Sequence, residues 1–164
     1  MAFWKRKGKG KMRDSKPILL LEDDTVDAMT VKRALKDIKV INPLVRTCNG
    51  EEGLAYLRDE KNPKPCVILL DLNMPKMNGL EFLGIVKADE QLKKIPAIVL
   101  TTSKDDQERL RGFQLNVAGY IIKPVDYAKF VEAVRIVNLY WTLSETPNCE
   151  QEITNANFQT NSAS

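Results

Sequence analysis

The sequence predicts an α/β protein, a three-layer sandwich in which a five-stranded parallel sheet lies between two layers formed by five helices. Short apolar runs recur along the chain, as expected for strands that are buried on both faces. Segments with apolar residues at helical spacing separate these runs. Strands that alternate with helices favour a parallel sheet whose connections are right-handed crossovers.

The predicted strands are short runs of apolar or β-branched residues. None approaches the roughly 20 apolar residues that a helix needs to span a bilayer. Because β-branched residues fit the pleated surface of a sheet, these runs favour extended structure. The five runs are Ile18–Leu21, Leu44–Thr47, Val67–Leu70, Ala97–Leu100 and Tyr120–Ile122.

The first three predicted helices begin at recognisable start signals. Asp24 or Thr25 can cap the first helix, because their side-chain oxygens accept hydrogen bonds from free backbone N–H groups. Asn49-Gly50 precedes the second helix, and Gly79 begins the third. The apolar residues at helical spacing are Val26, Met29, Ala34, Leu35 and Ile38 in the first helix, Leu54 and Leu57 in the second, and Leu80, Leu83 and Val86 in the third.

The last two predicted helices follow the fourth and fifth strands. Asp105 and Asp106 place negative charge at the start of the fourth helix, where the helix dipole favours it. The fifth helix runs from about Asp126 to Leu143. Its apolar residues recur at steps of four, three and four, which favours a core face over a ligand pocket. They are Phe130, Val134, Val137 and Trp141.

The length of 164 residues suits one compact domain with short tails. We expect a disordered basic arm over residues 1–15, a folded domain over residues 16–143 and a flexible tail over residues 144–164. The net charge of +3 belongs to the arm, because residues 1–17 contain seven basic residues and one acidic residue. The rest of the chain is therefore acidic on balance.

The composition excludes several kinds of site. Histidine is absent and the three cysteines lack CxxC spacing, which excludes common zinc sites and Ser-His or Cys-His catalytic pairs. The apolar stretch after the basic arm is too short for a signal peptide and ends in acidic residues. We therefore expect a cytoplasmic protein with no membrane association.

Polar groups follow four of the predicted strands. The first strand leads into Glu22-Asp23-Asp24, the third into Asp71, the fourth into Thr101-Thr102-Ser103 and the fifth into Lys123-Pro124. In an open parallel sheet, ligands bind beyond the carboxyl ends of the strands, so these groups should meet at one edge. Clustered carboxylates favour a hard divalent cation such as Mg²⁺. With an ammonium and a hydroxyl beside them, they predict phosphoryl transfer to an acid.

Each of these signals has an ordinary structural explanation when it is taken alone. An acidic cluster is usually a solvated turn, a Lys-Pro pair is common after a strand, and an aspartate after an apolar strand can cap a helix. Their joint occurrence at successive strand ends favours the phosphoryl-transfer hypothesis.

Five motifs resemble those of two-component response-regulator receiver domains, a family with a flavodoxin-like fold and strand order 2-1-3-4-5. The order agrees, and so does the spacing, with 30 residues from Asp71 to Thr101 and 22 from Thr101 to Lys123. The resemblance runs from about Lys16 to Leu143. The motifs are Leu20-Leu21-Glu22-Asp23-Asp24, Leu69-Leu70-Asp71-Leu72-Asn73-Met74-Pro75, Asn78-Gly79, Val99-Leu100-Thr101 and Gly119-Tyr120-Ile121-Ile122-Lys123-Pro124.

The resemblance implies that Asp71 accepts a phosphoryl group from a phosphohistidine of a sensor histidine kinase or a phosphotransfer protein. Asp23, Asp71 and the backbone carbonyl of Asn73 would bind Mg²⁺, and Glu22 would act through metal-bound water. The Asn73 side chain and Ser103 would tune loss of the phosphoryl group to water. Such a domain is a phosphoacceptor for signalling that assists its own phosphotransfer and dephosphorylation, and is not counted as an enzyme.

The resemblance also assigns roles around the phosphoryl group. Thr101 and Lys123 would donate hydrogen bonds to the phosphoryl oxygens. Tyr120 would be the switch aromatic that rotates as Thr101 moves. Pro124 would shape the loop, through the cis peptide bond that this family often has there, so that Lys123 points inward. The signal would leave through protein–protein contacts, because no output domain is expected after residue 143.

The lengths of the connections resemble those of small stand-alone regulators that accompany bacterial phytochrome-type histidine kinases. Those regulators are commonly dimers. We expect Tyr127, Val131 and Tyr140 on an outward face of the last helix, where they would form a homodimer interface or simply be scattered surface residues.

Several alternatives stay open at this point. The protein could be a phosphorelay intermediate or a phosphate sink. The basic arm could bind nucleic acid or an anionic membrane surface, although a solvated tail is favoured and neither partner is expected. A phosphatase with an aspartate nucleophile would carry a second aspartate where this chain has Asn73. A degenerate receiver would have lost one of the groups Asp23, Asp71, Thr101 and Lys123.

Overall fold

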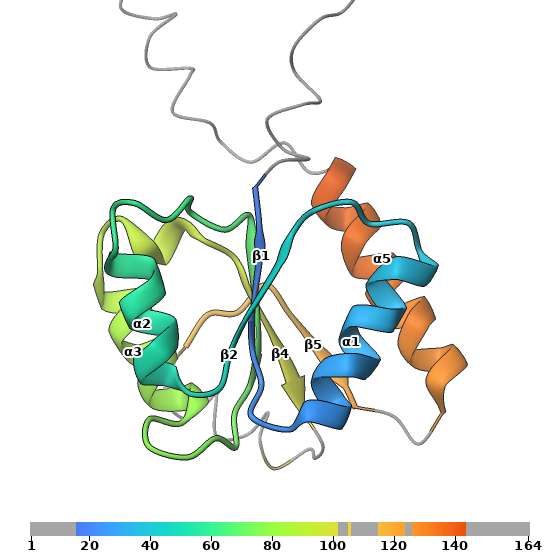
Figure 1. The fold of residues 1–164 in the computed structure, drawn as a ribbon, viewed down its shortest axis with the longest axis horizontal. Helices are drawn as coiled ribbons and strands as arrows, with labels where there is room; N and C mark the ends of the chain where they lie inside the picture. Colours follow the sequence, from blue (N-terminus) through green and yellow to red (C-terminus); the bar gives the residue numbers. More distant parts are fainter. Residues whose placement is uncertain (1–15, 102–104, 106–114, 124–125, 144–164) are drawn as a thin grey trace, which may run out of the picture.

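The computed structural model describes residues 16–101, 105, 115–123 and 126–143. Five strands form one sheet in the order β2-β1-β3-β4-β5, and every neighbouring pair is parallel (Figure 1). The predicted fold class and strand order are therefore confirmed. The strands are β1 (Ile18–Leu21), β2 (Leu44–Thr47), β3 (Val67–Asp71), β4 (Ala97–Thr101) and β5 (Gly119–Ile122).

Helices cover both faces of the sheet, with α2 and α3 on one face and α1 and α5 on the other (Figure 1). Most of the predicted fourth helix falls on residues 106–114, outside the described part of the chain. No helix among the described residues is long and apolar enough to cross a membrane. The helices are α1 (Thr25–Asp37), α2 (Gly50–Arg58), α3 (Gly79–Ala88) and α5 (Tyr127–Leu143), and Leu92–Lys94 form a short 3₁₀ helix, η1.

The sheet separates two hydrophobic cores. Successive side chains of a strand point to opposite faces, so Leu19 and Leu21 pack on the side of α2 and α3, whereas Leu20 packs on the side of α1 and α5. Phe82 is fully buried in the first core, and Phe130 is buried in the second. Burial of each large apolar side chain stabilises the fold by about 1.5–3 kcal/mol.

Asparagine and aspartate side chains fix the starts of three helices. Asp24 caps α1, Asn49 caps α2 and Asn78 caps α3, and each accepts a hydrogen bond from a backbone N–H three residues later. Glu81 completes a capping box with Asn78. Because α1 and α3 follow β1 and β3 closely, these caps also fix the loops at the carboxyl edge of the sheet.

The buried face of α1 differs from the predicted apolar stripe. Val26 and Met29 are 71% and 65% exposed, whereas Ala28 and Val31 are buried with Ala34 and Leu35. Two overlapping apolar stripes run along this helix, and helical periodicity alone does not choose between them. The residues of the second stripe pack in the core between α1, α5 and the sheet, which is why that stripe is the buried one.

The prediction that Tyr127 and Val131 lie on an outward face of α5 is wrong. Both residues are partly buried against the core beneath α1 and α5. The Tyr127 hydroxyl donates a hydrogen bond of 2.7 Å to Asp37, and the Arg33 guanidinium lies 4.7 Å from the centre of its ring. These contacts link the beginning of α5 to α1. The side chain of Tyr140 lies outside the described part of the structure.

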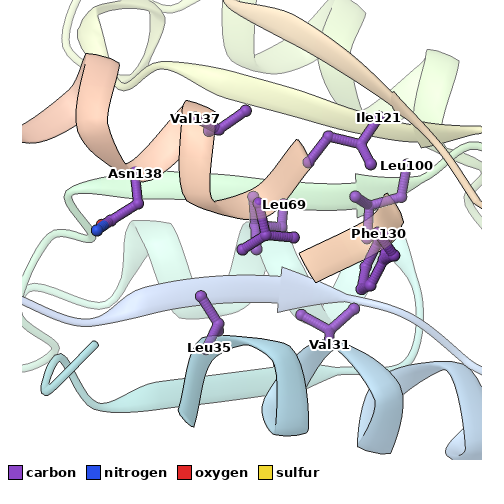
Figure 2. Close-up of a pocket in the computed structure, with 9 residues that line it drawn as sticks. Val31, Leu35, Leu69, Leu100, Ile121, Phe130, Val137 and Asn138 are labelled. Atoms are coloured by element: carbon purple, nitrogen blue, oxygen red, sulfur yellow. The ribbon is translucent and has the colours of Figure 1, made fainter. Parts of the chain in front are cut away.

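A small cavity of about 30 Å³ lies between α1, α5 and the sheet. Figure 2 shows side chains of Val31 and Leu35 from α1 converging on the same space as Phe130 and Val137 from α5. The lining is almost entirely apolar. A space of this size and lining is a packing gap in the core rather than a ligand site.

Candidate functional site

The carboxyl ends of the strands bring four of the predicted site residues to one edge of the sheet. β1 and β3 pair in register with Leu21 opposite Leu70, so the residues that follow them, Glu22 and Asp71, lie next to each other. Asp23 extends from the same loop as Glu22. Lys123 follows β5 and reaches back across the ends of the strands.

The Lys123 ammonium is the centre of the site. Its Nζ atom lies 2.7 Å from Glu22 Oε2 and 3.2 Å from Asp71 Oδ2. It also lies 2.7 Å from Asp27 Oδ2, which projects from the first turn of α1. One cation therefore binds three carboxylates from three different elements of the fold.

Burial shapes the protonation of this cluster. Desolvation raises the pKa of the fully buried Glu22 carboxyl, and the hydrogen bond and positive charge of Lys123 act in the opposite direction. Burial alone would lower the pKa of Lys123. Hydrogen bonds to Asp27 and Glu22 and the negative charge of Asp71 outweigh that effect, so the pKa of Lys123 is raised. The ammonium therefore stays charged at neutral pH.

The site carries more negative than positive charge. Carboxylate oxygens of Glu22, Asp23 and Asp71 all lie within 4.8 Å of one another, close enough to hold a metal ion. Together with Asp27 they place four carboxylates around one ammonium. A hard divalent cation prefers such oxygen ligands and would offset the excess, so the residues present fit a metal of this class.

Asn73 and Asp71 are joined within the loop that follows β3. The Asn73 backbone N–H donates to Asp71 Oδ1 at 3.2 Å. One carboxylate oxygen of Asp71 therefore faces Lys123 and the other accepts from the loop. The Asp71 residue is only 7% exposed, so its carboxylate has a fixed orientation.

Arg46 of β2 binds the backbone of the acidic loop, Glu22-Asp23-Asp24, that follows β1. Its guanidinium donates hydrogen bonds of 2.9 Å to the backbone carbonyls of Glu22 and Asp23. These two bonds fix the direction in which both carboxylates leave β1. Arg46 is not among the predicted site residues, although an arginine within a predicted strand is a signal for such a supporting contact.

Gly79 provides the close approach that the site needs beside Asp71. A Cβ atom at this position would lie 2.5 Å from the Asp71 carbonyl oxygen and 2.7 Å from Leu72 Cα. The Gly79 N–H donates to the Leu72 carbonyl at 3.0 Å. Glycine therefore lets the start of α3 press against the end of β3.

The remaining predicted site residues have different outcomes. Thr101 ends β4, paired with Ile122 of β5, but its side chain is outside the described part of the structure. Ser103 and Pro124 also lie outside the described residues. Tyr120 lies on β5 and is 36% exposed.

Asp27 is the functional candidate that sequence reasoning missed. It lies in the first turn of α1, where an acidic residue is expected simply from the helix dipole. Its position four residues after Asp23 is the only signal in the sequence, and that signal is weak. The contact with Lys123 depends on how α1 and β5 are placed.

Comparison with known proteins places this site in a family. The response regulator receiver domain family matches residues 18–135, which covers most of the chain. The chain belongs to this family. Its two-component receiver fold and its acidic cluster, which is typical of a phosphoacceptor site, make this receiver a signalling domain rather than an enzyme in the usual sense.

Relatives of this receiver include other response regulators, one of which is named as a phytochrome response regulator. The response regulator Rcp1 of Synechocystis is 34% identical over 130 residues, which are 77% of this chain and 88% of that protein. The structure of the phosphorylated cyanobacterial phytochrome response regulator RcpA matches with a TM-score of 0.72 at 34% sequence identity. The match covers 82% of this chain and 99% of the RcpA chain. The Mn²⁺-bound form of Rcp1 matches with a TM-score of 0.71 at 33% sequence identity, and the match covers 81% of this chain and 99% of the Rcp1 chain.

Proposed function

We propose that this receiver accepts a phosphoryl group on Asp71 from a histidine kinase, in a Mg²⁺-dependent reaction, and signals through protein contacts. The observation that carries the proposal is the position of Lys123, whose ammonium bonds the Asp71 carboxylate within a cluster of further carboxylates. This arrangement provides a nucleophile, a cation for the phosphoryl oxygens and ligands for a metal ion.

In the proposed reaction, a carboxylate oxygen of Asp71 attacks the phosphorus of a phosphohistidine. A P–O bond forms as the P–N bond breaks, and the electron pair of the P–N bond returns to the imidazole nitrogen of the kinase. The chemistry needs little from the protein beyond positioning and charge stabilisation. Lys123 donates to one phosphoryl oxygen and offsets the charge of the incoming group.

Glu22, Asp23, Asp71 and the backbone carbonyl of Asn73 would hold the Mg²⁺. When bound, the ion would supply positive charge beside carboxylates that outnumber the ammonium. The Mn²⁺-bound form of Rcp1 supports this, because it shows that a similar receiver takes up a divalent cation. Mg²⁺ is proposed for this chain because it prefers oxygen ligands and is commonly bound by one or two carboxylates with phosphate.

The other site residues complete the proposed switch. Thr101 donates to a second phosphoryl oxygen and moves toward it, and Tyr120 rotates into the space that this movement leaves. The side chains of Asn73 and Ser103 tune attack by water on the acyl phosphate. Pro124 shapes the loop that directs Lys123 inward.

A phytochrome-type histidine kinase is the proposed phosphodonor. The names of RcpA and of the bacteriophytochrome response regulator RtBRR, which is 35% identical with a TM-score of 0.68, support this choice. A homodimer through the region of the last helix is proposed with it. Ile136 of α5 is 65% exposed, and such an interface would cover this apolar side chain.

Labelling with radioactive acetyl phosphate tests the proposed phosphoacceptor. Wild-type protein should become labelled only when Mg²⁺ is present, and Asp71→Asn should abolish the label. Asp59→Asn is the matched control, because Asp59 is an exposed aspartate at the end of α2, away from the site. Undiminished labelling of Asp71→Asn at the same site would exclude the assignment. Transfer from the kinase to the receiver and onward would distinguish a terminal regulator from a relay intermediate or a phosphate sink.

A further inference from the structure

Asp27 shares Lys123 with the two acidic residues of the proposed phosphoacceptor site. Its Oδ2 atom lies 2.7 Å from Lys123 Nζ, closer than the 3.2 Å between Lys123 and Asp71. The position of Asp27 is fixed locally, because its backbone N–H donates to the Asp24 cap at 2.9 Å. The beginning of α1 therefore presents a third carboxylate to the ammonium.

The three acceptors use the full hydrogen-bonding capacity of Lys123. An ammonium has three protons to donate, and Glu22, Asp27 and Asp71 each accept one. A phosphoryl oxygen can therefore accept a hydrogen bond from Lys123 only when one of these carboxylates loses its hydrogen bond with Lys123.

The free-energy cost of losing contact with the Lys123 ammonium differs among the three carboxylates. The Glu22 side chain is fully buried, and the Asp71 side chain is 10% exposed. The Asp27 side chain is 45% exposed, so water can replace the ammonium there. A buried charge left without its partner is strongly destabilising, whereas an exposed ion pair contributes little. Asp27 is therefore the acceptor that is released at least cost.

We propose that Asp27 is a positioning residue that holds Lys123 before phosphorylation and releases it to the phosphoryl group. The inference rests on the proposed phosphoacceptor role of Asp71. In the unphosphorylated state Asp27 accepts the hydrogen bond from Lys123 that a phosphoryl oxygen would accept after phosphotransfer. It also adds a negative charge that attracts a metal cation and repels an anionic phosphoryl group.

Removal of the Asp27 charge should shift two affinities in opposite directions. In Asp27→Asn the third acceptor of Lys123 is uncharged and holds its proton more weakly, so the phosphoryl mimic beryllofluoride should compete for that proton more easily and bind more tightly. The same change removes negative charge from the metal cluster and leaves Lys123 more strongly bound to Glu22 and Asp71. Mg²⁺ should therefore bind more weakly.

The experiment measures both affinities in the full-length protein. Beryllofluoride binding is followed by ¹⁹F NMR at saturating Mg²⁺, and Mg²⁺ binding alone by calorimetry. Asp27→Asn should bind beryllofluoride about tenfold more tightly, the effect of one charge-assisted hydrogen bond, and Mg²⁺ severalfold more weakly. Asp27→Glu, which keeps the carboxylate, should restore the wild-type pattern.

A purely structural role for Asp27 would not give this pattern, because a disturbed helix start weakens both ligands together. Glu51→Gln is the matched control, since Glu51 is an exposed acid in the first turn of α2. Unchanged affinities, or a parallel change in both, would overturn the inference. Failure of the wild-type protein itself to bind beryllofluoride would instead count against the proposed function of Asp71.

Discussion

Lys123 Nζ lies 2.7 Å from Glu22 Oε2, although the two residues are 101 positions apart in the chain. Glu22 is fully buried, so this contact gives a buried carboxylate the cation that it needs. The pair also connects the end of β5 to the end of β1 across the sheet. The same ammonium therefore supports the fold and serves the proposed chemistry.

Replacement of the ammonium should destabilise the protein in a metal-dependent way. Lys123→Met leaves Glu22 and Asp71 without their cation, which should lower the free energy of unfolding by about 3 kcal/mol in the presence of EDTA. Added Mg²⁺ should restore part of this loss, because it supplies positive charge to the same carboxylates. Urea unfolding with and without Mg²⁺ measures both effects.

The matched control for that variant is Lys93→Met. Lys93 pairs with Glu90 at 2.7 Å, but both side chains are exposed, so its loss should cost less than about 1 kcal/mol and should not respond to Mg²⁺. Equal losses for the two variants would contradict the structural role assigned to Lys123.

Two glycines in α3 should respond to alanine in opposite ways. Gly79→Ala would place a Cβ 2.5 Å from the Asp71 carbonyl, which must shift the end of β3 and should cost about 1–3 kcal/mol and slow labelling of Asp71. At Gly84 an added Cβ would meet no other atom within 4 Å, so Gly84→Ala should stabilise the helix by about 0.5–1 kcal/mol. Thermal unfolding of both variants checks the pair, and a stable, normally labelled Gly79→Ala would contradict the close approach.

Glu22 should make stability fall as the pH rises in the absence of metal. Burial raises the pKa of Glu22 above its ordinary value of 4.5, so the folded state keeps this proton over a pH range in which the unfolded state has lost it. The unfolded state then binds fewer protons, and the contribution of Glu22 to stability decreases as the pH passes upward through 4.5.

The measurement is the difference in unfolding free energy between the wild type and Glu22→Gln in EDTA, from about pH 4 to about pH 7. This difference should change in favour of the variant as the pH rises. A difference that moves in favour of the wild type would show that Lys123 outweighs burial.

Neighbouring aspartates provide a test of the metal ligands. Asp23→Asn removes a carboxylate of the cluster and should weaken Mg²⁺ binding by about tenfold or more, with little effect on stability because Asp23 is exposed. Asp24→Asn should leave Mg²⁺ binding close to wild type, because asparagine also caps helices well. Calorimetric titration of both variants separates metal ligation from general loss of charge.

Local patterns in the sequence were sufficient to predict the positions of the strands along the chain. The predicted strands agree with the observed strands to within one residue at each end. Asp24, Asn49 and Gly79 mark helix starts where the sequence placed them. Strands and helix caps depend on residues that are neighbours in the chain, so they can be predicted from the sequence alone.

Local sequence patterns did not predict which side of a helix is buried. Val26 and Met29 are exposed although they lie at helical spacing, and Tyr127 is partly buried against the core with its hydroxyl bonded to Asp37 of α1. These outcomes depend on how two helices pack on one face of the sheet. Periodicity describes one helix at a time and does not contain that information.

By itself, the sequence determined the order of strands and helices along the chain. It also determined which acidic, hydroxyl and lysine groups follow the strands. Because parallel strands bring their carboxyl ends to one edge of the sheet, these groups were expected to meet there. Only the tertiary structure decided which groups contact Lys123. Asp27 joins Glu22 and Asp71 there, and Arg46 fixes the acidic loop. Such contacts join residues from separate elements, and their distances are set by the packing of those elements rather than by the local pattern of the chain.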